Sequence, residues 1–489
     1  MLPAASKYVH KLIKRRYGMK NNFYKPHLRI LSALLVLALT LTVLFSCTEP
    51  RVYTKDEINS NISSIDTSVS RYEYVYLYLQ DIGIPTFDTT KFLWAEMVFN
   101  RNFNLDSGLP ATSEHARLTA EAFMSEYYDV IDLTDKSAVT DALITCYTEA
   151  IGDPYSIYRV PEDSSDYTSD MSGKFGGIGV VIEYDHSAET LTVSSIFIDS
   201  PADKAGFMVG DIIWAVDGEL VSELGYLNAV YYVRGEIGTD VTVTVKRGEQ
   251  LLDLVATRAE VEEKTVDYIL EDGYGYIQIT SFKDNTDKQF IEAIDYMEAN
   301  GAKGIIFDLR GNPGGYLHTV CNMLSYLLPT GKKLVSYTYK GEQTQYNNAA
   351  DDPHPTMKNE DGEVVKVDHT LTLPFVVICD EYTASAGEIF TSVIRDYKAE
   401  RLLNATIVGK TTYGKGIMQS SVQYYDGSTI TLTVAYYNPP SEINYHGVGV
   451  TPDVTVENEI GTDEDGKQYL IDNQLSTAYD ELEKLVNAN

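Results

Sequence analysis

Strand-like and helix-like segments alternate along the chain from about residue 262. The strand-like runs are GYGYIQITSF, KGIIFDLRGNPGG and PFVVICD. The segments that follow each of them, TDKQFIEAIDYMEANG, YLHTVCNMLSYLL and SAGEIFTSVIRDY, have apolar residues at helical spacing. This alternation predicts an α/β core whose functional loops lie at strand ends. Further strands are predicted in ATIVGKTTYGKGIMQSSVQYYDGSTITLTVAYYNPP.

The other parts of the chain have different residue patterns, and together they predict an α+β multidomain protein. Helical patterns dominate residues 71–170, although GDPYSIYRVPEDSSDYTSD within them predicts turns and loop. Short β-rich runs with two short helices predict one small mixed module at 171–260. The α/β core is assigned to 261–460, with a polar inserted loop or hairpin at 340–370. An acidic tail with a last helix is predicted at 461–489.

Residues 1–46 resemble a secretory signal sequence, with either Met1 or Met19 as the start. They carry eight basic residues and no acidic one, and they end in ILSALLVLALTLTVLFS, which Cys47 follows. LFSC resembles a bacterial lipobox, which implies lipidation of Cys47. The alternative is an uncleaved membrane anchor, although the run is at the short end of the ~17–25 residues that a spanning helix needs. Both interpretations predict a tether at 47–70 and a location in the bacterial cell envelope, at a membrane.

Composition argues against several function classes. A formal net charge of −32 should repel nucleic acid. Beyond Cys47, three sparse cysteines provide neither a disulfide framework nor zinc spacing, and one of them, Cys379, is predicted to be a core residue. The histidines show no paired metal-ligand spacing, and there is no phosphate loop or dinucleotide fingerprint. We therefore predict no metal and no cofactor.

Ser385 stands among small residues in YTASAGEIF, directly before a predicted helix. Small neighbours let a side chain stand clear of the backbone, as a nucleophile requires, but a serine hydroxyl also needs a base beside it. His318 and His446 are candidate bases for a Ser-His-Asp triad.

Lys415 is a different candidate base, in TTYGKGIMQ. An exposed lysine, with a pKa of ~10.4, stays charged at neutral pH. Burial in an apolar pocket lowers the pKa of a lysine, and a neutral amine could take the proton from Ser385. The glycines on both sides would allow the close packing that such a pocket needs. The alternative is an ordinary solvated turn lysine.

These motifs together resemble the carboxyl-terminal processing peptidases of serine peptidase family S41. The resemblance covers about residues 150–455, in the order of the family. It implies an α/β core related to the crotonase and ClpP fold. The motifs that carry it are DPYSIY, FGGIGV, SPADKAGFMVGDIIWAVDG, VRGEIGTDVTVTVKR, GYIQITSF, DLRGNPGG, ASAGEIF, VGKTTYGKG and GVGVTPDV.

The resemblance implies that Ser385 is the nucleophile and that Lys415 is the general base, which later protonates the leaving amine. Gln419 matches the supporting glutamine of the family, which would orient Lys415. Two features depart from the pattern. The link between Ser385 and Lys415 is longer than usual, and Lys410 stands where an acid is common, which makes it a rival base.

DLRGNPGG, residues 308–315, ends a predicted strand with glycines that could expose backbone N–H groups. Taken alone, this segment could equally be a plain glycine turn. The resemblance implies an oxyanion hole made by the N–H of Ala386 and one N–H from Gly314 or Gly315.

The module after residue 176 resembles a PDZ domain. Such domains add a peptide as an extra strand and bind its terminal carboxylate with N–H groups of a glycine loop. Here that loop would be FGGIG, that is Phe175, Gly176, Gly177, Ile178 and Gly179. The implied partners are protein substrates with accessible, partly apolar C-termini. The sequence is also compatible with an adaptor protein or a homo-oligomer.

Three functions follow from these observations. The first is a serine endopeptidase that cleaves or trims proteins near their C-termini with a Ser-Lys dyad. The second is an inactive relative that holds C-terminal tails with its PDZ domain. The third is a crotonase-type enzyme acting on an acyl thioester, which the PDZ module and the signal sequence disfavour. We therefore predict the endopeptidase.

Overall fold

The chain forms two compact units, Thr168–Lys264 (the smaller unit) and the remainder (the larger unit). The computed structural model describes residues 51–52, 87–103, 112–185, 190–197, 199–339, 342–347, 356–358, 364–366, 369–462 and 468–488. The predicted signal sequence, Cys47 and the first predicted helix, YEYVYLYLQDI, lie outside the described residues. Within those residues, no helix is both long enough and apolar enough to cross a membrane.

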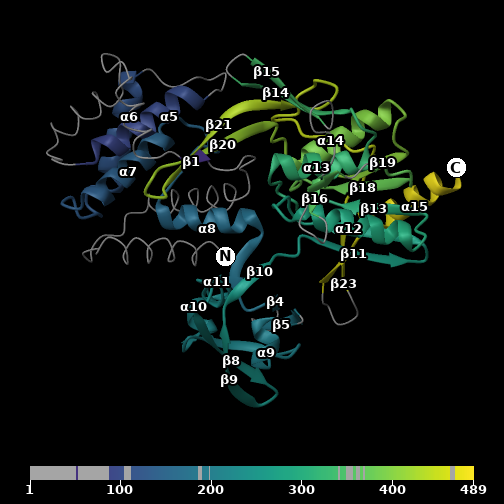
Figure 1. Cartoon of the computed structure of the whole chain (residues 1–489), viewed down its shortest axis with the longest axis horizontal. Helices are drawn as coiled ribbons and strands as arrows, with labels where there is room; N and C mark the ends of the chain where they lie inside the picture. The colour runs from purple at the N-terminus through teal and green to yellow at the C-terminus, as the bar shows by residue number, and fades with distance from the viewer. Residues whose placement is uncertain are drawn as a thin grey trace. The chain divides into compact units, whose positions relative to one another are not determined.

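A six-stranded sheet, here called the core sheet, organises the larger unit (Figure 1). Its order is β11-β12-β13-β18-β19-β22, in which β11 and β12 are antiparallel and all other neighbours are parallel. Every residue of β13, β18 and β19 is buried, as expected where layers cover both faces. The strands span Val266–Glu271, Tyr274–Ile279, Gly304–Asp308, Phe375–Cys379, Ala405–Gly409 and Val454–Thr455.

Helices cover both faces of the core sheet because alternate residues of a strand point to opposite sides. Ile305 and Phe307 of β13 join α12 (Thr286–Ala299), α13 (Leu317–Leu327) and α14 (Ala386–Ala399) in the main hydrophobic core. On the other face, α15 (Asn473–Asn487) packs Ala478 and Leu482 against a separate apolar cluster. The predicted acidic tail therefore contains a layer of the fold. The strand residues in that second cluster are Ile306, Val376, Ile378 and Val408.

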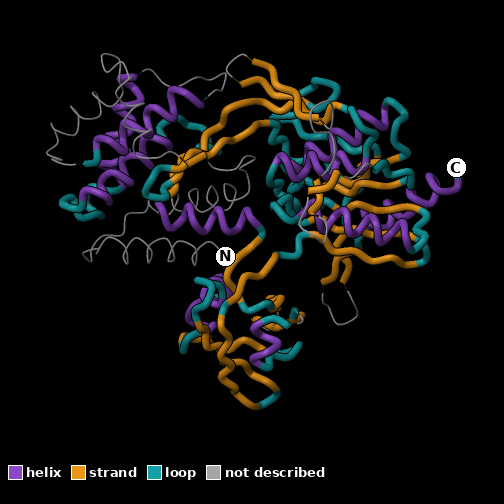
Figure 2. The backbone as a smooth tube through the Cα atoms, in the orientation of Figure 1, coloured by secondary structure: helices purple, strands orange, loops and turns teal. Residues whose placement is uncertain are grey.

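A second sheet, here called the ribbon sheet, is built on the long hairpin of β20 (Ile417–Gln423) and β21 (Thr429–Asn438). Figure 2 shows this ribbon running from the core sheet to the N-terminal helices. Within the predicted insertion, β15 extends the ribbon sheet and β16 and β17 form a separate hairpin. The remaining bounds are β1 Arg51–Val52, β2 Ile157–Arg159, β14 Lys333–Tyr339, β15 Glu342–Asn347, β16 Thr356–Lys358, β17 Val364–Lys366, β23 Glu459–Thr462 and β24 Gln468–Ile471.

The N-terminal helices pack on the far end of this ribbon. Lys91 is buried, and its Nζ contacts Asp141 at 2.7 Å and Asp426, in the hairpin turn, at 2.6 Å. A buried cation paired with two carboxylates ties the helices to the hairpin. The helices are α5 (Thr89–Asn102), α6 (Thr112–Glu126) and α7 (Lys136–Glu149).

The prediction of turns and loop at 152–170 was wrong in part. Ile157–Arg159 form β2, which pairs with β21, and α8 spans Pro161–Ser172. Proline at the first helical position and the acids Glu162 and Asp163 in the first turn both favour a helix start here.

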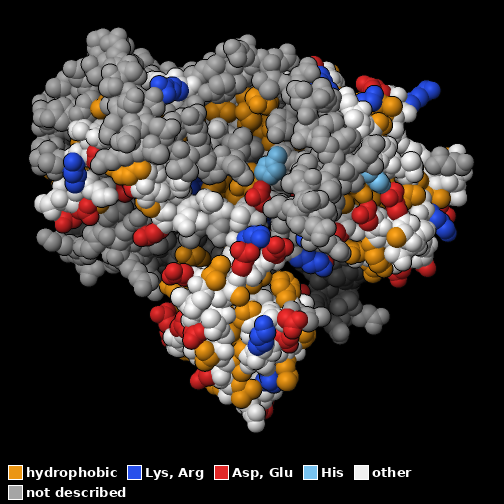
Figure 3. Space-filling model, in the orientation of Figure 1, with side chains coloured by type: hydrophobic (Ala, Val, Ile, Leu, Met, Phe, Trp, Pro, Cys, Tyr) orange, Lys and Arg blue, Asp and Glu red, His pale blue; other side chains and the backbone are white. Residues whose placement is uncertain are grey.

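The smaller unit is a sheet of order β4-β5-β6-β8-β9, antiparallel throughout, with β7 beside β6. Val241, Val243 and Val245 alternate along β8 and fill its core. Figure 3 shows hydrophobic side chains interspersed with charged ones on the visible face of this unit. The bounds are β3 Lys174–Gly177, β4 Val180–Asp185, β5 Thr190–Ile196, α9 Pro201–Ala205, β6 Ile212–Val216, β7 Glu219–Leu220, α10 Val221–Leu224, α11 Tyr226–Val233, β8 Asp240–Arg247, β9 Gln250–Thr257 and β10 Ala259–Glu262.

One expectation about this unit needs correction. Phe175–Gly177 are not part of an open loop, because they lie in β3 and pair with Ala259–Val261 of β10. Only Ile178 and Gly179 remain outside a strand, and Gly179 has a φ of 79°. A strand partner more than 80 residues further along the chain supplies hydrogen bonds that a local pattern does not reveal.

Candidate active site

Ser385 lies at the N-cap of α14, in the short connection that follows β18. Its φ of 53° and ψ of −114° fall in a region that non-glycine residues rarely adopt, and the residue is fully buried. Strained residues of this kind persist where the surrounding structure holds them, and they gather at active sites.

Glu388, one turn into α14, holds the backbone on both sides of the site. Its Oε2 accepts the N–H of Ser385 at 2.9 Å and the N–H of Lys415 at 2.7 Å. Its Oε1 accepts the N–H of Gly414 and the hydroxyl of Thr412, both at 2.6 Å. One buried carboxylate therefore joins the proposed nucleophile to the segment that carries the proposed base. Burial raises the pKa of Glu388, while these four hydrogen bonds favour its charged form.

Glu388 was not among the site residues predicted from the sequence. A signal was present, because Ser385 and Glu388 have the S-x-x-E spacing of a capping box at a helix start. That pattern predicts the bond to the Ser385 N–H. It does not predict the bonds to Thr412, Gly414 and Lys415, which are 24 to 27 residues away.

Lys415 is fully buried, which rules out the alternative of a solvated turn lysine. Both neighbouring glycines are needed for this placement. Gly414 has a φ of 92°, and a Cβ on Gly416 would lie 2.8 Å from the backbone nitrogen of His446. The Nζ of Lys415 lies over the ring of Tyr155, 4.8 Å from its centroid.

Gln419 lies on β20, at a β-bulge in the pairing with β21, and is buried. Its Nε2 donates to Oγ1 of Thr433 at 3.3 Å. Its Oε1 is also buried, and it has no hydrogen-bond partner among the described residues.

The rival bases differ in their surroundings. His318 is partly exposed and contacts Asp284 at 2.9 Å. Lys410 pairs with Glu381 at 3.0 Å and with Glu457 at 2.7 Å, and these hydrogen bonds raise the pKa of Lys410, which disfavours a neutral amine.

The third rival, His446, lies beside the Lys415 loop. The pKa of His446 lies below its ordinary value mainly because the side chain is partly buried, and the charge of Lys415 lowers this pKa further. His446 comes from a different loop, but its backbone nitrogen would lie only 2.8 Å from a Cβ on Gly416, the residue after Lys415.

The glycine turn after β13 lies against Ser385. A Cβ on Gly314, whose φ is 106°, would lie 2.8 Å from the Ser385 Cβ and 2.9 Å from the Ala386 nitrogen. The Gly314 N–H already donates to Oδ1 of Asn312 at 2.8 Å. Gly315 and Ala386 have no acceptor for their N–H groups among the described residues. These two N–H groups are therefore the better pair for an oxyanion hole.

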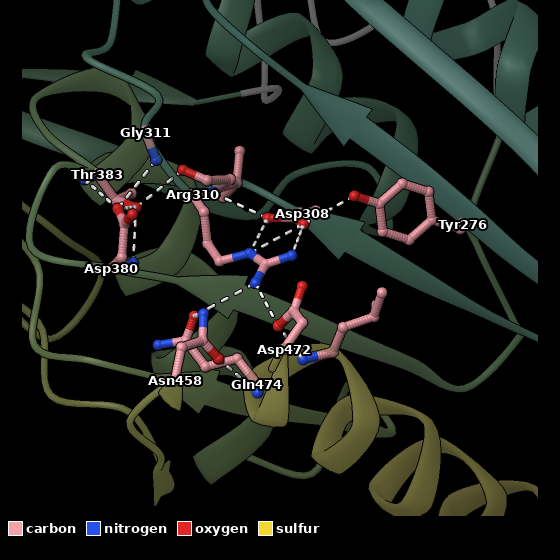
Figure 4. A network of polar contacts seen from close by, with 11 residues as sticks. Tyr276, Asp308, Arg310, Gly311, Asp380, Thr383, Asn458, Asp472 and Gln474 are labelled. Carbon is pink, nitrogen blue, oxygen red and sulfur yellow. Dashed lines mark hydrogen bonds and ion pairs between the residues drawn. The ribbon is translucent and has the colours of Figure 1, made fainter. Parts of the chain in front are cut away.

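Two polar clusters hold the loops in place (Figure 4). Arg310 forms ion pairs with Asp308 at 2.6 Å and with Asp472, the N-cap of α15, at 2.7 Å. The Tyr276 hydroxyl donates to Asp308 at 2.8 Å. The last helix is thereby attached to the loop that follows β13.

The second cluster joins this loop to the one that carries Ser385. Oδ1 of Asp380 accepts the N–H of Gly311 and the N–H of Thr383, each at 3.0 Å. The Thr383 hydroxyl donates to the carbonyl of Leu309 at 2.8 Å. The glycine turn and the serine are thus held by shared partners.

The fold and the site define a serine protease with a PDZ module. The family model of Peptidase family S41 matches residues 273–456, and the family model of the PDZ domain matches residues 176–257. The chain is 35% identical over 341 residues to the carboxy-terminal processing protease CtpA of Bacillus subtilis (strain 168), which covers 69% of this chain and 67% of that protein. The chain belongs to peptidase family S41, with the carboxy-terminal processing serine proteases as its relatives.

The chain is also similar to a second curated protease and to a solved structure. A probable CtpA-like serine protease of Staphylococcus haemolyticus (strain JCSC1435) is 32% identical over 318 residues, or 65% of this chain and 60% of that protein. Among solved structures, a photosystem II D1 C-terminal processing protease has a TM-score of 0.40 and 22% identity, over 79% of this chain and 93% of that chain. The predicted family, mixed fold and enzyme class are confirmed by the family matches and by the CtpA relative.

Proposed function

We propose that the chain cleaves proteins near their C-termini with Ser385 as nucleophile and Lys415 as general base. The observation that carries this proposal is the shared carboxylate of Glu388, which bonds the backbone N–H of both residues. Full burial of Lys415 supports the role of base, because burial disfavours the ammonium form of a lysine.

In the proposed reaction, Oγ of Ser385 attacks the substrate carbonyl and its proton passes to Nζ of Lys415. The N–H groups of Ala386 and Gly315 stabilise the oxyanion. Lys415 then gives the proton to the leaving amine, and water hydrolyses the acyl-enzyme with Lys415 again as base. Gln419 orients Lys415, and its buried Oε1 has a lone pair available for the ammonium.

The smaller unit would select the substrate. β4 is the edge strand of its sheet, so a peptide can add beside it as a further strand. Tyr184 of β4 stacks on Tyr226 at the start of α11, with ring centroids 4.5 Å apart, which supports a groove wall on that side. The proposed ligand is a protein tail with an apolar end, bound near Ile178 and Gly179.

The proposed location is the bacterial cell envelope, with attachment to a membrane through lipidated Cys47 or through an uncleaved signal anchor. The basic and apolar character of residues 1–46 supports this location. An adaptor protein or a homo-oligomer would be consistent with such a protease.

The first test compares the wild-type chain with Ser385→Ala. Each is incubated with an unfolded protein that has an apolar C-terminal tail, and the products are identified by mass spectrometry. We expect fragments from the wild type only, because the alanine variant lacks the attacking oxygen, while tail binding survives. Tail binding without fragments from either protein would instead favour a PDZ scaffold, and fragments from both would exclude Ser385 as the nucleophile.

A further inference from the structure

The turn Asp153–Ser156, the DPYS of the sequence, has no part in the mechanism above. It connects α7 to β2, and β2 pairs with β21 of the ribbon sheet. The turn is held internally, since Asp153 accepts the N–H of Tyr155 at 3.3 Å and the hydroxyl of Ser156 at 2.6 Å. The N-terminal region therefore places an ordered turn beside β21, the strand that pairs with β20.

Hydrogen bonds link this turn to Gln419 through one intermediate residue, Thr433. Oδ2 of Asp153 accepts the hydroxyl of Thr433 at 2.7 Å, and Oγ1 of Thr433 accepts the Nε2 of Gln419 at 3.3 Å. Asp153, Thr433 and Gln419 are all buried, so this chain of hydrogen bonds is shielded from competing water.

The same turn places an aromatic ring at the proposed base. The ring centroid of Tyr155 is 4.8 Å from Nζ of Lys415, within the roughly 6 Å over which a cation interacts with a ring face. Because Lys415 is fully buried, solvent does not weaken this interaction. Burial also raises the pKa of Tyr155, so its ring stays neutral at physiological pH.

We propose that Tyr155 is a positioning residue for Lys415, whose ring face stabilises the ammonium that forms when Lys415 takes the proton from Ser385. This inference rests on the proposed function, because it assumes that Lys415 is the base. It assigns a role in catalysis to the N-terminal region, which lies outside the residues that match the S41 family description.

Other charged or titratable groups surround Lys415 and remain unchanged in the test. Glu388 of α14 accepts its backbone N–H, and His446 interacts with it from the neighbouring loop. Tyr413, in the segment before Lys415, forms a hydrogen bond with Tyr155, and Asp153 of the same turn interacts electrostatically with Tyr155.

The experiment compares two variants of the full chain. Tyr155→Leu keeps an apolar side chain near Lys415 but removes the ring, whereas Tyr155→Phe keeps the ring and removes only the hydroxyl that bonds Tyr413. The readout is the acid limb of kcat/KM against pH, which reports the base of the free enzyme. We expect Tyr155→Leu to move this limb to lower pH by about 0.4 to 1.5 units, because the ammonium loses its cation–π partner. Tyr155→Phe should keep the wild-type limb.

A second measurement needs no turnover. Lysine labelled with 13C at Cε is titrated by NMR in the Ser385→Ala background, and the Lys415 signal is assigned by its loss in Lys415→Met. The Lys415 midpoint should fall by the same amount in Tyr155→Leu and not in Tyr155→Phe. An unchanged or raised midpoint in Tyr155→Leu overturns the inference. An equal fall in both variants also overturns it, because the hydroxyl would then be responsible.

The two measurements also separate this inference from the proposed function. The wild type could show no cleavage while the Lys415 titration midpoint still falls only in Tyr155→Leu. In that case the proposed function fails and the contact between Tyr155 and Lys415 stands. If the wild type cleaves its substrate and neither variant changes the acid limb or the midpoint, only the inference about Tyr155 fails.

Discussion

His446 is a titratable residue beside the loop that carries Lys415, and its protonation should affect the stability of the fold. Burial lowers the pKa of His446 below its ordinary value of 6.5, so the folded protein resists a proton that the unfolded chain accepts. Stability should therefore fall as the pH drops from about 7 through 6.5, with a slope of at most about 1.4 kcal/mol per pH unit from this residue. As the pH falls over this range, the thermal unfolding midpoint of His446→Gln should decline less than that of the wild type. Equal declines in the two proteins would contradict a lowered pKa of His446.

At the scale of an element, α15 should be required for the stability of the core sheet. Leu482 is fully buried, and a Cβ added to Gly304 of β13 would lie 2.7 Å from its Cδ1. Leu482→Ala should lower the free energy of unfolding by about 2–5 kcal/mol, because it leaves a cavity between helix and sheet. Leu470→Ala, at a residue 58% exposed, is the matched control and should be nearly neutral. Denaturant unfolding measures the free energy of unfolding of both variants. Similarly small losses in the two would show that the packing of α15 contributes little to the stability of the core sheet.

At the scale of the whole molecule, substrate choice should depend on the smaller unit and cleavage on the larger one. We expect Ser385→Ala to bind a peptide with an apolar end and a terminal carboxylate at least roughly tenfold more tightly than the same peptide with a terminal amide, since hydrogen bonds to a charged group contribute about 1.5–3 kcal/mol. Isothermal titration calorimetry with the two peptides provides the comparison. Equal affinity would argue against carboxylate recognition near Gly179.

Elements whose pattern is local were predicted well. The core strands, α12, α13 and α14 follow apolar periodicity, and the confirmed family rests on motifs within them. The missed helix α8 had local start signals, but two other predictions failed because they depended on distant partners. Phe175–Gly177 became a strand because β10 pairs with it, and the segment after Ser156 gained β2 because β21 lies alongside.

The sequence by itself determined which residues could carry the chemistry, because a serine before a helix and a lysine between glycines are local patterns. Only the tertiary structure decided how they are held. Glu388 bonds a segment 24 to 27 residues away, and Asp153 bonds Thr433 across 280 residues. Spacing along a chain does not encode such contacts, because they depend on how sheets and loops pack in space.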